Sequence, residues 1–263
     1  MKAAIPLLIL LAACGPQSPQ PTNETEPTAP ASKPAPPPAR PFVDEEKNEL
    51  IDFHFSWSAE AAAVPELVDR FQKELKQIKA ATIEDAREGK ANSAANGFEF
   101  QPYMLSTDYT TAGQSDRLLS LRDETGSYTG GAHGNSGTGA LLWDRASSRE
   151  LKIADLFAAP ANMERLLTQP WCDALNQERE KKRGEPVGGG GMFDDCPKLE
   201  EIALIPADAD GNGRFEKLML VAAPYVAGPW VEGSYEIELP VSSDLIAALK
   251  GDYKASFEAA QPQ

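Results

Sequence analysis

Hydrophobic residues follow two different periods along the first part of the chain. In residues 50–57 (LIDFHFSW), apolar and polar positions alternate, so that Ile51, Phe53 and Phe55 share one face and His54 lies on the other. Alternation with a period of two predicts a half-buried β-strand. On its polar face, His54 is interpreted as a surface histidine rather than a ligand.

The next segment changes to a helical period. Its apolar residues recur every three or four positions, at Val64, Leu67, Val68, Phe71, Leu75 and Ile78. This spacing predicts an amphipathic helix with one face against a sheet. Pro65 fits its first turn, where the missing N–H costs nothing. The helix should end within the polar residues 87–97.

The remaining patterns mix strands and helices without a strict βαβ alternation. Strands are predicted in residues 98–113, 116–131, 138–151, 200–225 and 233–240, with a short helix following the last of them. Residues 151–184 are predicted to be mostly helical, with breaks near Pro160 and Pro170. This order favours an α+β fold with mixed or antiparallel sheets and packed helices.

The N-terminus has the pattern of a secretory signal. Residues 1–13 combine Lys2, a short apolar run and small residues before Cys14, and the run is too short to span a membrane. The sequence LAACG resembles a bacterial lipobox, which implies acylation of Cys14. By analogy with Gram-negative sorting, Gly15 then points to the periplasmic face of the outer membrane. The alternative is an ordinary cleaved signal followed by an unrelated cysteine.

Residues 14–41 are rich in proline and contain no aromatic side chain, which predicts an extended tether. The tether could give reach, serve only as a spacer, or present its prolines to a partner.

The formal net charge of −15 changes which partners are plausible. Nucleic acid is excluded, because its binding requires a basic surface. Contact with a membrane is expected through the lipid anchor only. An acidic surface favours basic partners, although it could also serve only solubility.

Two cysteines remain besides Cys14. In an oxidising compartment, Cys172 and Cys196 are expected to form a disulfide. Closing the intervening segment would stabilise the fold by roughly 3 kcal/mol. A metal pair or a catalytic thiol is the alternative.

A glycine-rich segment at residues 127–139 (SYTGGAHGNSGTG) is the first candidate site. Its candidate ligand residues are Tyr128, Gly130, Gly131, His133, Gly134 and Asn135. Consecutive glycines allow close approach of backbone N–H groups to a ligand, and an imidazole can donate a hydrogen bond or act as a base. The alternatives are a purely structural turn, and a hydrolase that uses His133 with an unidentified carboxylate. A carboxylate beside His133 in an open pocket would favour the enzyme, whereas a buried His133 bonded to backbone would not.

The second candidate site is an acidic loop at residues 208–216 (DADGNGRFE). Alternating oxygen ligands at Asp208, Asp210 and Asn212, closed by Glu216, suit calcium. The twelfth position, where an EF-hand carries glutamate, is Met219, so the loop is not an EF-hand. The alternative is a turn rich in aspartate, asparagine and glycine for conformational reasons.

The glycine-rich block YTGGAHG, the following LWD and LKIADLF, and the stretch AAPYVAGPWVEGSYEIELPV resemble the PdaC/RsiV-like family over residues 48 to 250. The resemblance implies a paired extracytoplasmic α+β module, with a PdaC-like part at 42–140 and an RsiV-like part at 141–263. The resemblance does not include the deacetylase domain that lies beside this module in PdaC, so deacetylation is not expected from it. One member of the family binds lysozyme.

These observations lead to an expectation about function. We expect a lipid-anchored, non-catalytic module that binds a cell-wall component, such as a peptidoglycan fragment, or a wall-acting protein such as lysozyme. A wall-modifying hydrolase and a purely structural envelope lipoprotein are the alternatives.

Overall fold

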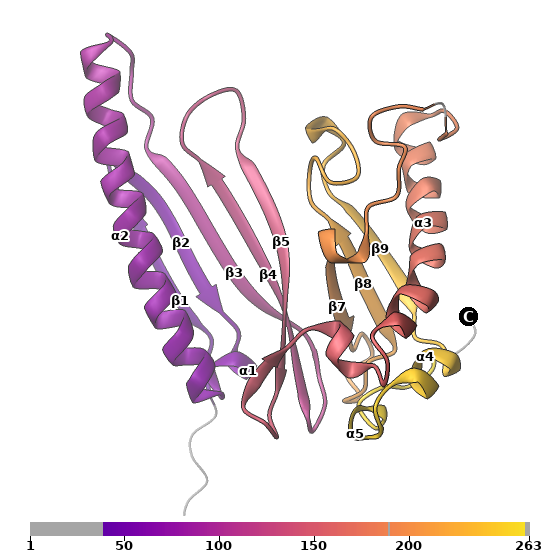
Figure 1. Ribbon diagram of the computed structural model, residues 1–263. Helices are drawn as coiled ribbons and strands as arrows, with labels where there is room; N and C mark the ends of the chain where they lie inside the picture. The colour runs from indigo at the N-terminus through magenta and orange to yellow at the C-terminus, as the bar shows by residue number, and fades with distance from the viewer. Residues whose placement is uncertain (1–38, 189, 261–263) are drawn as a thin grey trace, which may run out of the picture. The chain divides into compact units, whose positions relative to one another are not determined.

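A computed structural model describes residues 39–188 and 190–260 (Figure 1). The signal peptide, Cys14 and nearly all of the predicted tether lie outside these residues. The described residues belong to one compact unit. Among the described residues, no helix combines the length and the apolar character that a membrane span requires.

The larger sheet has six strands that lie in chain order. These are β1 (Phe42–Lys47), β2 (Ile51–Trp57), β3 (Tyr103–Gln114), β4 (Leu118–Tyr128), β5 (Asn135–Asp144) and β6 (Arg149–Leu151). All neighbours are antiparallel except β2 and β3. The parallel pair needs a crossover connection, which α1 (Ala59–Ala62) and α2 (Pro65–Ala95) supply.

The alternation predicted for β2 is confirmed. Ile51, Phe53 and Phe55 are at most 1% exposed, and they share a core with Leu67 and Phe71 of α2. The helix predicted from the apolar stripe therefore covers one face of the larger sheet (Figure 1).

Strand β1 was not predicted, because half of its sequence FVDEEK consists of acidic residues. It is held at the sheet edge by contacts with distant parts of the chain. Phe42 stacks on Trp57 with ring centroids 3.8 Å apart, and Asp44 pairs with Lys79 of α2 at 2.9 Å. Tertiary contacts thus decide its conformation against a weak local preference.

The smaller sheet has three antiparallel strands in the order β7-β8-β9. They are β7 (Ala203–Ala207), β8 (Lys217–Ala222) and β9 (Tyr235–Pro240). The helices α3 (Ala161–Arg183), α4 (Ser243–Ala248) and α5 (Gly251–Lys254) accompany this sheet, with 3₁₀ turns η1 (Ile153–Leu156), η2 (Leu199–Glu201) and η3 (Trp230–Glu232). Two sheets with separate helices confirm the α+β class.

The predicted break at Pro170 is wrong, although α3 does begin directly after Pro160. Proline inside a helix removes one hydrogen bond and costs about 3 kcal/mol. Here the helix buries Leu167, Trp171 and Leu175 on one face, and the indole Nε1 of Trp171 donates to a backbone carbonyl at 3.0 Å. Burial of three large side chains offsets the cost of the proline.

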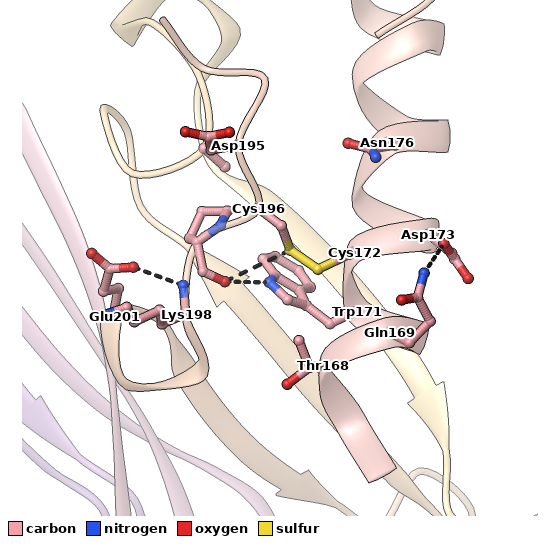
Figure 2. The surroundings of a disulfide bond; sticks show 12 residues. Thr168, Gln169, Trp171, Cys172, Asp173, Asn176, Asp195, Cys196, Lys198 and Glu201 are labelled. Atoms are coloured by element: carbon pink, nitrogen blue, oxygen red, sulfur yellow. Dashed lines mark hydrogen bonds between the residues drawn. A yellow bond between two sulfur atoms is a disulfide. The ribbon is translucent and has the colours of Figure 1, made fainter. Parts of the chain in front are cut away.

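The predicted disulfide between Cys172 and Cys196 is confirmed (Figure 2). It joins the middle of α3 to the segment that leads into η2. Close to it, the Trp171 indole donates to the carbonyl of Pro197. The covalent bond and this hydrogen bond fix the same stretch of chain against the helix.

The larger sheet continues beyond residue 140, the expected boundary between the two parts of the module. Residue 140 lies within β5, and the sheet extends to Leu151 in β6.

Candidate functional site

The glycine-rich segment forms the connection between β4 and β5. Gly130 and Gly131 both adopt φ 97°, a backbone conformation that side-chain-bearing residues rarely adopt. The Tyr128 hydroxyl donates to the Gly131 carbonyl at 3.1 Å and supports the turn. Asn135 opens β5 and pairs with Ser127 of β4. These residues shape the connection.

His133 lies in this connection, two residues before β5, and is exposed. Its ring stacks on Trp230 of η3, with centroids 4.1 Å apart and an angle of 20° between the planes. Its Nδ1 lies 2.9 Å from the Gly134 carbonyl, and the Trp230 Nε1 donates to the same carbonyl at 3.1 Å. A segment almost one hundred residues away in sequence therefore closes the glycine-rich connection.

Tyr225 completes this arrangement, since its hydroxyl lies 3.5 Å from the Nε2 of His133. It adopts φ 72°, which is uncommon for any residue except glycine and marks local strain. Its side chain is 55% exposed, and that of Trp230 is 38% exposed. We call His133, Tyr225 and Trp230 the aromatic patch.

The aromatic patch is suited to binding rather than to proton transfer. Tyr and Trp offer large rigid faces together with a polar handle, and they are enriched among residues that dominate binding energy. The faces can also attract a cationic side chain. The chemistry of the patch thus suits a sugar ring or a basic protein surface.

The surroundings of His133 match neither the arrangement expected of a hydrolase nor that of a purely structural turn in full. His133 is exposed and not buried, and its hydrogen bonds within the described residues go to the Gly134 carbonyl and the Tyr225 hydroxyl. The carboxylate partner required by the hydrolase alternative is not among these contacts. General base chemistry needs such a geometry before any tuning of the pKa.

The acidic loop brings three of its predicted residues together. Carboxylate oxygens of Asp208, Asp210 and Glu216 all lie within 4.8 Å of one another. One Glu216 oxygen, Oε2, is buried and has no hydrogen-bond partner within the described residues. These features fit a calcium ion.

Other contacts in the same loop fit a self-contained turn. The Asp208 carboxylate accepts hydrogen bonds from the N–H groups of Gly211, Asn212 and Gly213, at 2.8, 3.1 and 2.9 Å. The side chain of Asn212 contacts Asp210 and Glu258 instead of joining the three carboxylates. Calcium stays a prediction.

His54, the second histidine, occupies a polar network on the face of the larger sheet opposite α2. Its Nε2 lies 2.8 Å from Asp108 of β3, and its Nδ1 lies 3.1 Å from Glu45 of β1. Burial opposes the charged ring, but the hydrogen bonds and charges of Asp108 and Glu45 outweigh it and raise the pKa of His54. The histidine joins three neighbouring strands.

Asp123 is a carboxylate without a histidine partner, and it lies beneath α2. Burial, followed by the charge of Glu74, raises the pKa of Asp123 to about 6. Its Oδ1 atom is buried and unpaired within the described residues. Nearby, Tyr109 donates to the Glu74 carboxylate at 2.9 Å. This cluster could not be predicted from local patterns, because the helix and the strands that form it are separated along the chain.

Comparison with known proteins finds a family similarity over part of the chain. Residues 44–136 match the family model described as deacetylase PdaC. The expected PdaC/RsiV-like resemblance is thereby confirmed. The PdaC-like segment comprises most of β1, all of β2, β3 and β4, both α1 and α2, the glycine-rich connection and the first two residues of β5.

Two crystal structures of the DUF3298 family share the fold at low sequence identity. One, from Bacteroides fragilis, is 17% identical, with a TM-score of 0.52, and the match covers 82% of this chain and 95% of that chain. The other, from Pseudomonas aeruginosa, is 18% identical, with a TM-score of 0.51, and the match covers 83% and 96%. No curated protein matches the sequence. The likeness therefore extends beyond the PdaC-like segment as a likeness of fold.

Proposed function

We propose that the protein is a lipid-anchored, non-catalytic binding module of the cell envelope. It recognises a cell-wall component, such as a peptidoglycan fragment, or a wall-acting protein such as lysozyme. The aromatic patch is the observation that carries this proposal. Cys14 supplies the anchor, and the outer membrane facing the periplasm of a Gram-negative bacterium is the proposed location.

The aromatic patch is organised before any ligand arrives. Trp230 is held by its hydrogen bond to Gly134 and by stacking on His133, and the backbone of Tyr225 is held by a hydrogen bond from its N–H to the Gly228 carbonyl at 3.0 Å. Side chains that are already ordered lose less conformational freedom on binding, which increases affinity. Strain at Tyr225 is a further sign of a functional site.

Charge favours a basic partner over a neutral one. The chain carries a formal charge of −15, and an acidic field accelerates encounter with a cationic protein. Lysozyme meets this requirement. A glycan would depend on the faces of Tyr225 and Trp230 and would respond little to salt.

The test is binding of the protein to immobilised lysozyme and, separately, to purified peptidoglycan, each at low and high salt. Saturable lysozyme binding that weakens with salt would support a sensor or inhibitor of a wall-acting protein. Salt-insensitive peptidoglycan binding would support a glycan receptor. The same measurements are made on Trp230→Ala, which removes one ring of the aromatic patch. Val231→Ala is its matched control, because Val231 is an 83% exposed neighbour outside the aromatic patch. Binding to neither material would contradict the proposal.

A further inference from the structure

One side of strand β5 is open over most of its length. Strand β6 pairs only with Leu142, Trp143 and Asp144 of β5. Residues 135–141 pair with β4 on the other side, and no further strand pairs with them within residues 39–188 and 190–260. We propose that this free edge binds an extended basic peptide segment, which adds to the larger sheet as a new strand beside β5.

The backbone groups that face the open side can be assigned from two hydrogen bonds. The N–H of Arg145 donates to the Arg117 carbonyl at 2.9 Å, on the β4 side. Since alternate residues of a strand point to opposite neighbours, Ser136, Thr138 and Ala140 present their N–H and C=O groups outward. The Gly134 carbonyl follows the same alternation and receives the Trp230 indole from outside.

The open stretch is therefore limited at both ends. Trp230 caps it beyond Asn135, and β6 closes it from Leu142 onward. The interval holds three outward-facing residues, which suits about five or six residues of an added antiparallel strand, or roughly 20 Å.

Other sheet edges carry the features that normally prevent such pairing. The edge strand β1 contains Asp44, Glu45 and Glu46, and the edge strand β7 contains Pro206. Charged residues and proline on an edge discourage addition of another strand. The residues NSGTGA at 135–140 include neither, and the β4–β5 register runs through them without a bulge.

A groove of about 780 Å³ runs beside the open edge. Thr138, Gly139 and Ala140 of β5 form part of it, and β7 contacts β5 here. Its other apolar lining includes Leu142, Leu151, Met163, Leu199, Ile202 and Val221. An added strand could place alternate apolar side chains in this groove.

The charges around the groove indicate which peptide fits. Four glutamates line it, namely Glu150, Glu164, Glu200 and Glu201, together with Lys152. Glu150 pairs with Arg70 and Glu200 lies 3.7 Å from Lys198, whereas Glu164 and Glu201 form no ion pair within the described residues. A peptide that alternates apolar and basic residues would match both the lining and the charge. A second copy of this chain would bring the same glutamates to the interface, together with a formal charge of −15, so self-pairing is disfavoured.

The experiment measures binding of a fluorescent octapeptide that alternates lysine and valine to the complete chain by fluorescence anisotropy. Thr138→Pro removes one outward N–H without removing a β4 hydrogen bond, and Gly137 before it tolerates the proline. We expect Thr138→Pro to weaken binding at least tenfold. Thr138→Val, which keeps the backbone N–H, should stay within twofold of the wild type.

A second variant keeps the test decisive if the proline disturbs folding. Glu164→Gln with Glu200→Gln should weaken binding several-fold at low salt and reduce its salt dependence, while circular dichroism stays unchanged. Tyr225→Ala should leave peptide binding unaltered, which separates this surface from the aromatic patch.

Three results would overturn the proposal. The first is equal peptide binding by Thr138→Pro with an unchanged unfolding transition. The second is equal affinity for an octapeptide alternating lysine and glycine, which would reduce the interaction to charge alone. The third is a dimer in light scattering that Thr138→Pro dissociates, which would make a second copy the occupant of the edge.

Discussion

The two histidines of this chain lie in opposite surroundings. His54 has a carboxylate at each ring nitrogen, Asp108 and Glu45, and joins three strands of the larger sheet. His133 stacks on an exposed tryptophan and contacts backbone and a tyrosine hydroxyl. The first arrangement uses the hydrogen-bonding capacity of the ring inside the protein, whereas the second leaves the ring and its aromatic neighbours facing outward. Surroundings, rather than residue type, separate a stabilising histidine from a candidate recognition histidine.

The largest effect is expected from His54→Ala. Removing the ring leaves Asp108 and Glu45 facing each other without their shared partner, and we expect a loss of about 2 kcal/mol in the free energy of unfolding at pH 6. Urea unfolding measures it. Lysozyme or peptidoglycan binding should be unchanged, and a loss of binding without a loss of stability would reverse the comparison.

Trp230→Ala tests the aromatic patch around His133. We expect about a tenfold loss of affinity for lysozyme or peptidoglycan, equivalent to about 1.4 kcal/mol, because the mutation removes the central ring of the aromatic patch. The urea midpoint should shift by much less than in His54→Ala. Surface plasmon resonance with Val231→Ala alongside would show whether the loss belongs to this ring.

Asp123→Asn examines a carboxylate that lacks the histidine partner of Asp108. With the pKa of Asp123 at about 6 in the folded protein and 3.8 as its ordinary value, folding binds a proton between these values, so stability falls as pH rises through this window. Asparagine mimics the protonated form. We expect about 1 kcal/mol of stabilisation above pH 7, reduced by the partial exposure of the side chain, and almost none near pH 4. Unfolding curves at both pH values measure the difference, and stabilisation of equal size at both would contradict it.

The smallest effect is the pH dependence contributed by His54. Its pKa is raised in the folded protein, so its stabilisation is complete below its ordinary value of 6.5 and is lost as pH rises through the folded value. The stability advantage of the wild type over His54→Gln should therefore shrink between pH 6 and pH 9. An advantage that grows with pH would show that the neutral ring is the form the network prefers.

Local patterns predicted the parts of this protein that depend on local chemistry. The alternation at Ile51, Phe53 and Phe55, the amphipathic helix beginning at Pro65 and the disulfide between two cysteines all follow from spacing and residue type. The passage of α3 through Pro170 does not, because burial of Trp171 decides it and burial depends on the rest of the fold.

The candidate site also has one part that local sequence predicts and one part that it does not. Glycines and a histidine at residues 130–134 marked an unusual connection, but its aromatic partners could not be predicted from that segment. Tyr225 lies 92 residues from His133, and Trp230 lies 96 residues from Gly134. A stretch similar to a known family included both residues, yet spacing alone could not show which loop they meet.

Contacts between residues 252–256, in and directly after α5, and the turn that joins β3 to β4 give the chain a particular order of assembly. The Ser115 hydroxyl donates to that of Ser256, and Arg117 approaches Asp252 at 3.4 Å, although more than 130 residues separate each pair. Such remote pairings slow folding, because a long loop must close before the contact forms. The turn has hydrogen bonds of its own, such as the one from the Ser115 N–H to the Leu118 carbonyl at 2.8 Å, and these can form early in synthesis. Its contacts with residues 252 and 256 must wait until those residues have been made. The docking of residues 252–256 on this turn is therefore a late event in assembly, and it joins the two sheets of the fold only after each has its own strands.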